Sequence, residues 1–160
     1  MRAPLRYGLA ISVLSVPAFA ELLHVEQSFG GFECLSCVES IVKGAKRLRG
    51  VESAEVDAKR GVVHIRLAEG NRVKLDAIRD AIKATGFTPG EAAITAKGSL
   101  QENQFVVAGS QQVFTTSGEA KKEWPSGVAT AVGVVPASSA GEPLRLNIRE
   151  LRASRPEGAK

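Results

Sequence analysis

Cysteine, histidine and methionine are scarce in this chain, with two, two and one copies among 160 residues. The single methionine is Met1, so the rest of the chain offers no thioether to a metal ion. Serine, histidine and acidic residues show no spacing that indicates a hydrolytic triad, and there is no glycine-rich phosphate-binding loop. The sequence therefore predicts that the protein is not an enzyme.

An excess of charge of either sign is also missing. Two of the 21 Lys and Arg residues lie in the first 20 residues, which leaves 19 against 17 acidic residues and a net charge of +2. Nucleic-acid binding depends on a strongly basic surface. This weak balance therefore argues against a nucleic acid as the partner.

Apolar runs long enough to span a bilayer, which takes about 20 residues, are absent too. A shorter run occupies residues 9–16, preceded by Arg2 and Arg6 and followed by small residues at the −3 and −1 positions, Ala18 and Ala20. This pattern is typical of a secretory signal peptide cut after Ala20. The residue directly after the cut is Glu21 and not a cysteine, so a lipoprotein anchor has no acceptor. We expect residues 1–20 to be removed and the protein to be periplasmic or secreted, without a membrane anchor.

Residues 21–90 alternate strand and helix signals. Leu23 and Val25 alternate with His24 and Glu26, which predicts a first strand. Further strands are predicted at residues 51–57, at 62–67 and from residue 87, and amphipathic helices begin at about residues 36 and 74. The order βαββαβ predicts an α+β domain of the ferredoxin-like plan, with two helices on one face of an antiparallel sheet.

Residues 91–153 have a different sequence pattern, in which short extended segments are separated by Gly, Ser, Asn and Pro. This pattern predicts a second, small β-rich domain, either a barrel or a sandwich. The same strands would alternatively extend the first sheet. Residues 154–160 are expected to fray. The extended segments are predicted at residues 93–100, 105–108, 113–116, 128–135 and 144–151.

The two cysteines, Cys34 and Cys37, stand three positions apart just before the first predicted helix. Thiolates are soft ligands that select Cu(I), Zn(II) and similar ions. The unpaired N–H groups and the dipole at a helix start favour the thiolate form. Two thiolates match the near-linear preference of Cu(I) or Hg(II), whereas Zn(II) takes four ligands. Glu33, beside the first cysteine, would supply a carboxylate ligand, or else it is a solvated loop charge.

The cysteine pair admits two other interpretations. A Cys-x-x-Cys pair at a helix start is also typical of thiol–disulfide oxidoreductases, although the Gly-Pro between the cysteines of the thioredoxin kind is missing. A structural disulfide in an adaptor protein is the third possibility, and its very short loop would stabilise the fold little. His24 and His64 are predicted on strands, on the face opposite the core, and we interpret them as solvated.

Several of these motifs together resemble the heavy-metal-associated domain. They are the loop at residues 31–37, the helix after it, Gly50-Val51 at the next strand and the later Gly86-Phe87 pair. That family includes copper chaperones, N-terminal domains of metal-pumping ATPases and the periplasmic mercury-binding protein. The resemblance covers about residues 22–89.

The resemblance implies that Cys34 and Cys37 are the metal ligands and that Phe87 packs near their loop. Phe32 stands where the family usually has Met, and Glu33 stands where zinc-pumping relatives have a coordinating aspartate. The expected function is to capture, transfer or sequester one soft metal ion, Cu(I) or Hg(II) before Zn(II). The expected partner is a metal-transport or metal-accepting protein.

Overall fold

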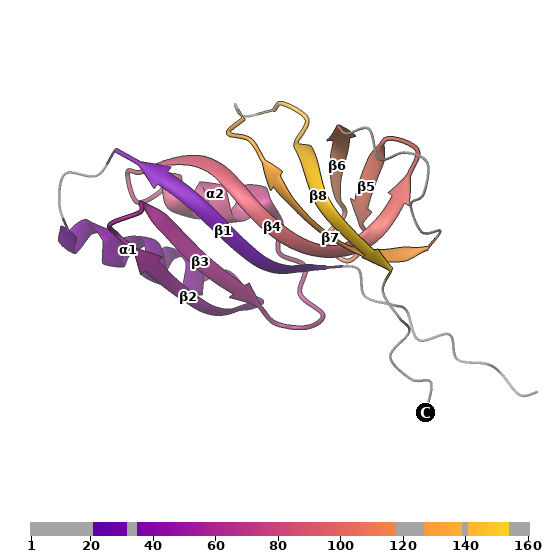
Figure 1. Ribbon diagram of the computed structural model, residues 1–160. Helices are drawn as coiled ribbons and strands as arrows, with labels where there is room; N and C mark the ends of the chain where they lie inside the picture. Colours follow the sequence, from indigo (N-terminus) through magenta and orange to yellow (C-terminus); the bar gives the residue numbers. More distant parts are fainter. Residues whose placement is uncertain (1–20, 32–34, 118–126, 139–140, 154–160) are drawn as a thin grey trace, which may run out of the picture.

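The computed structural model describes residues 21–31, 35–117, 127–138 and 141–153. Within these residues the chain forms eight strands and two helices (Figure 1). The predicted signal peptide and the tail at 154–160 lie outside the described residues. The elements are β1 (Leu22–Gly30), α1 (Leu35–Lys46), β2 (Val51–Asp57), β3 (Val62–Leu67), α2 (Leu75–Lys83), β4 (Thr88–Gln101), β5 (Gln104–Val107), β6 (Gln112–Ser117), β7 (Val128–Val135) and β8 (Arg145–Ala153).

The N-terminal part is an antiparallel sheet in the order β2-β3-β1-β4, with α1 and α2 on one face (Figure 1). The chain order β1-α1-β2-β3-α2-β4 confirms the predicted ferredoxin-like plan. The turn between β2 and β3 forms because the side chain of Asp57 accepts hydrogen bonds from the backbone N–H groups of Lys59 and Arg60. Gly61 then takes a positive φ of 61°, which glycine adopts without strain.

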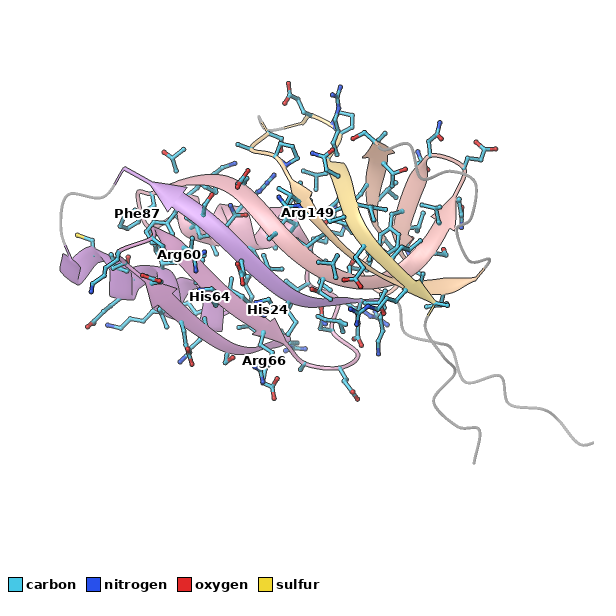
Figure 2. The ribbon with its side chains drawn as sticks, in the orientation of Figure 1. His24, Arg60, His64, Arg66, Phe87 and Arg149 are labelled. Atoms are coloured by element: carbon cyan, nitrogen blue, oxygen red, sulfur yellow. The ribbon has the colours of Figure 1, made fainter. Side chains whose placement is uncertain are left out.

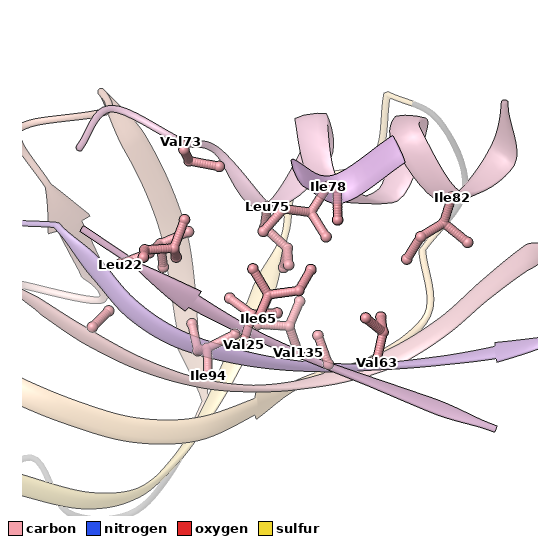
Figure 3. Packing of buried hydrophobic residues seen from close by; sticks show 14 of the residues in the cluster. Leu22, Val25, Val63, Ile65, Val73, Leu75, Ile78, Ile82, Ile94 and Val135 are labelled. Carbon is pink, nitrogen blue, oxygen red and sulfur yellow. The ribbon is translucent and has the colours of Figure 1, made fainter. Parts of the chain in front are cut away.

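The core of this part lies between the helices and the sheet. Figure 3 shows Leu75, Ile78 and Ile82 packed over Val25 and Ile65, and all five side chains are fully buried. Their burial follows from helical spacing on α2 and from alternation on the strands. The opposite face of β1 and β3 carries the half-exposed side chains, and neither described helix covers it.

The start of β1 differs from the expected alternation. Leu22 is fully buried, whereas Leu23 is only half-buried. The pairing of β1 with β4 shifts register between Leu22 and His24. Such an irregularity breaks the strict alternation of faces. The predicted strand is confirmed, but Leu22 takes the buried position next to Val25 on the core side and Leu23 does not.

Strand β4 belongs to two parts of the structure. It is 14 residues long and pairs with β1 over residues 88–96, with β7 over 92–99 and with β5 over 99–101. The pairing of β4 with β7 closes β4, β5, β6, β8 and β7 into a barrel. The predicted barrel and the alternative of an extended first sheet therefore both hold. The domain boundary predicted at residue 90 falls within β4.

The strand order of the barrel has a known counterpart. Its strands β6 and β8 run parallel, and its other neighbours run antiparallel. This order is that of the OB-fold, a five-stranded Greek-key barrel. Phe105, Phe114 and Leu146 fill the interior and are fully buried. Because folds of this kind host many activities, the barrel alone assigns no ligand.

Two glycines let the barrel close. A Cβ on Gly98 would lie 2.6 Å from the carbonyl oxygen of Val106, and one on Gly133 would lie 2.6 Å from that of Asn147. Both distances are far below a normal contact, so only glycine allows the neighbouring backbone this near.

A buried arginine joins the barrel to the ferredoxin-like part. Arg79 on α2 is 4% exposed. Burial lowers the pKa of Arg79, and the nearby carboxylate of Asp76 opposes this by raising it. Hydrogen bonds from the guanidinium to five oxygen atoms offset the cost of burying its charge. These are Gln27 Oε1 in β1, the carbonyl oxygen of Gly90 in β4, that of Val135 in β7, and Pro136 O and Ser138 Oγ after β7.

Candidate metal centre

The loop that carries the cysteines leaves the sheet at the end of β1. Gly31 takes a positive φ of 84° directly after the strand, a conformation that glycine adopts without strain. Helix α1 begins four residues later, at Leu35. Glu33 and Cys34, two of the three predicted ligands, lie outside the described residues.

Cys37, the third predicted ligand, lies in the first turn of α1 and is exposed to solvent. The first turn contains no acidic residue, so no carboxylate there opposes a negative charge on sulfur. The helix dipole and the unpaired N–H groups of a first turn stabilise a thiolate. The position therefore suits a cysteine that works as an anion, either as a metal ligand or as a nucleophile.

Cys37 is disulfide-bonded in this structure, and no free cysteine occurs among the described residues. A disulfide sulfur is not the thiolate that a soft metal ion requires. Reduction of the disulfide to two thiols takes two electrons and two protons. The redox state of Cys37 therefore decides whether it is able to act as a ligand.

Two aromatic rings pack against each other at the end of the sheet where β1 ends and β4 begins. The rings of Phe29 and Phe87 meet edge to face, with centroids 5.4 Å apart, and both are nearly fully buried. Because Gly30 at the end of β1 pairs with Thr88, Phe87 sits beside the point where the loop begins (Figure 2). The role of Phe87 beside the cysteine loop stays a prediction, because residues 32–34 lie outside the described residues.

A second group of side chains of the types that hold metal ions lies away from the cysteines. His24 and Glu26 of β1 and His64 of β3 lie together on the open face of the sheet. The sequence predicts both histidines as solvated residues, without a connection between them. The i, i+2 spacing of His24 and Glu26 was a signal for a shared face. The position of His64 opposite them required the β1–β3 register, which the sequence alone does not provide.

One family model matches part of the chain. The heavy-metal-associated domain model matches residues 30–88. No curated protein matches the chain.

Solved structures include copper proteins, each covering less than half of this chain. The CopZ metallochaperone is 23% identical, covers 41% of this chain and 97% of its own, with a TM-score of 0.38. The copper-binding domain of the P-type ATPase HMA7 is 24% identical, covering 46% and 92%, with a TM-score of 0.37. The yeast copper transporter domain Ccc2a is 22% identical, covering 45% and 93%, with a TM-score of 0.39.

The residues that the family model matches coincide with elements of the ferredoxin-like part. The matched residues run from the end of β1 to the start of β4 and include both helices. They also include both cysteines of the chain. Residues 30–88 of this chain therefore match the heavy-metal-associated domain, and β4 joins this part to a five-stranded barrel.

Proposed function

We propose that the reduced protein binds one soft metal ion through the thiolates of Cys34 and Cys37 and then transfers or sequesters it. The observation that carries this proposal is the match of the heavy-metal-associated domain to residues 30–88, which contain both cysteines. The exposed position of Cys37 in the first turn of α1 supports it. An exposed site with two ligands suits transfer, because an incoming thiol is able to add before an old one leaves.

The donor set favours Cu(I) or Hg(II) as the ion. Two thiolates satisfy an ion that accepts two ligands, whereas Zn(II) takes four. Zn(II) would therefore need Glu33, water or a partner's side chain to complete its coordination. Met1 is the chain's only methionine and belongs to the proposed signal peptide, so a thioether would not add to the site.

We further propose that the protein is exported and exchanges metal with a transport or acceptor protein. Export is supported by the signal-peptide pattern in residues 1–20. Exposed Lys43, Lys46 and Arg47 in and after the last turns of α1 would favour an acidic partner surface. Among the described residues, neither helix is long and apolar enough to cross a membrane.

The first test compares reduced and oxidised protein. Anaerobic titration with Cu(I) against a chromogenic chelator should show one tightly bound equivalent in the reduced protein. The oxidised protein should lose that equivalent, because a disulfide offers no thiolate. Equal binding by both forms would show that the thiols are not the ligands, and the proposal would then be withdrawn.

A second experiment asks what Glu33 contributes. In competition between Zn(II) and Cu(I), Glu33→Ala should weaken Zn(II) binding about tenfold or more, by analogy with other losses at zinc sites. Cu(I) binding should stay unchanged, because two thiolates already satisfy that ion. Glu39→Gln, an exposed substitution on α1, is the matched control. An unchanged ratio in Glu33→Ala would return Glu33 to the role of a solvated loop charge.

The disulfide at Cys37 favours a second candidate function, that of a thiol–disulfide oxidoreductase. In that case the reduced cysteine pair would pass two electrons to a substrate disulfide, so that the pair becomes a disulfide and the substrate a dithiol. Catalysis of insulin reduction that depends on Cys37, together with absent Cu(I) binding, would favour this function over metal transfer. Partner binding that survives loss of both cysteines would instead favour an adaptor protein.

A further inference from the structure

The open face of the ferredoxin-like sheet brings three potential metal ligands together. His24 and Glu26 are two positions apart on β1, so their side chains share a face. Glu26 pairs directly with His64 in the antiparallel β1–β3 ladder. Figure 2 shows His24 and His64 next to each other on this face, which lies opposite α1 and α2.

The distances between the ligand atoms are short. One carboxylate oxygen of Glu26 lies 3.7 Å from Nε2 of His24 and 3.5 Å from Nδ1 of His64. One ligand atom from each residue can be chosen so that all three lie within 4.8 Å of one another. The two imidazole rings are stacked, with centroids 6.2 Å apart and planes inclined by 28°.

These separations are close to those around one bound ion. With metal–ligand bonds of about 2.0–2.2 Å, neighbouring ligands of a tetrahedral ion lie roughly 3–4 Å apart. Small rotations of the three side chains would bring their ligand atoms into that range. The strands hold the backbone positions, so most of the ordering is already present in the fold.

The surroundings leave room for an ion and for further ligands. The side chains of His24, Glu26 and His64 are 40%, 39% and 32% exposed. Glu55 of β2 pairs with His64 and adds a second carboxylate to this part of the sheet. Arg66 pairs with His24 and opposes a cation, but it is exposed, so solvent and salt screen its charge.

We propose that His24, Glu26 and His64 form a second metal site, for a borderline divalent ion such as Zn²⁺ or Cu²⁺. Imidazole suits zinc, copper and nickel, and a carboxylate adds a hard, charged ligand. Three protein ligands on an open face leave at least one coordination position to water or to an external ligand. The cysteine pair, in contrast, selects soft ions. The two sites would hold ions of different chemistry, and this second site needs no reduced thiol.

The test uses the chain in its oxidised form, in which the thiols are blocked. Titration with Zn²⁺ should show one bound equivalent by calorimetry, and Cu²⁺ should compete for it. The chain has only two histidines, so nitrogen NMR of the imidazoles reports on this site alone. Both rings should shift on Zn²⁺ binding, with the metallated nitrogen of each identified by its tautomer.

Three substitutions remove one ligand each. His24→Ala and His64→Ala should weaken Zn²⁺ binding about 100-fold, and Glu26→Gln about tenfold or more. Glu69→Gln, which removes an exposed carboxylate in the turn after β3, is the control and should leave affinity unchanged. Circular dichroism of each variant verifies the fold, and Glu26→Gln is nearly isosteric if a histidine variant proves unstable.

Several outcomes would overturn the proposal. They are the absence of Zn²⁺ binding to the oxidised chain, imidazole signals that do not move, and binding that survives all three substitutions. Loss of Cu(I) binding in the reduced chain would leave this second site unaffected, since it uses no sulfur. The two proposals therefore fail independently.

Discussion

Replacement of Cys37 by serine is expected to abolish tight binding of Cu(I) by the reduced protein, with affinity falling by at least about 1,000-fold. A hydroxyl is a hard, neutral ligand, whereas Cu(I) prefers a soft thiolate. Cu(I) takes two ligands. When one of them is removed, the ion keeps only one strong bond to the protein. The measurement is anaerobic competition with a Cu(I)-specific chelator of known affinity.

The control for this variant is Glu39→Gln, on the same helix and also exposed. It changes the charge of α1 without removing a thiol and should bind Cu(I) like the unchanged protein. A Cys37→Ser protein that keeps its Cu(I) affinity would show that Cys37 is not a ligand. Retained Zn²⁺ binding by the His24–Glu26–His64 site in this variant would show that the fold is intact.

Replacement of Arg79 by methionine is expected to destabilise the protein by about 3 kcal/mol, a large part of a typical domain's stability. Methionine fills much of the same volume but donates no hydrogen bond. Gln27 Oε1 in β1 and the carbonyl oxygen of Val135 in β7 would lose their buried donor. The measurement is the free energy of unfolding in urea, followed by far-ultraviolet circular dichroism.

The matched control is Lys83→Met, one turn further along α2 on an exposed side chain. Its ion pair with Asp80 lies at the surface, and such pairs contribute about 0–1 kcal/mol. Because Arg79 contacts both β1 and the loop after β7, the ferredoxin-like part and the barrel should unfold together. If Arg79→Met costs no more than Lys83→Met, the arginine does not join the two parts in the way we describe.

Local structure could be predicted well from the sequence. The apolar alternation at residues 51–57, 62–67 and 128–135 matches β2, β3 and β7. Both helices also follow from their apolar periodicity. These patterns are informative because the alternation of a strand and the turn of a helix are local properties that side-chain burial makes visible.

Contacts between residues far apart in the chain could not be predicted from the sequence. The two histidines are 40 positions apart in the sequence, and only the β1–β3 register places them around Glu26. Arg79 has the pattern of an ordinary helix residue, and its acceptors include atoms more than 50 positions away. Backbone carbonyl oxygens carry no residue signature, so the sequence contains no signal for these partners.

The sequence by itself therefore determined the order of helices and strands, the ferredoxin-like plan and the cysteine pair at the start of α1. Periodicity and spacing suffice for these features, because each depends on residues that are near one another in the chain. The tertiary structure decided that β4 serves both parts, that Arg79 is buried between them and that His24, Glu26 and His64 meet on the open face. Strand register and barrel closure depend on which distant edges pair, and the physical reason is that this choice minimises the energy of the whole core at once.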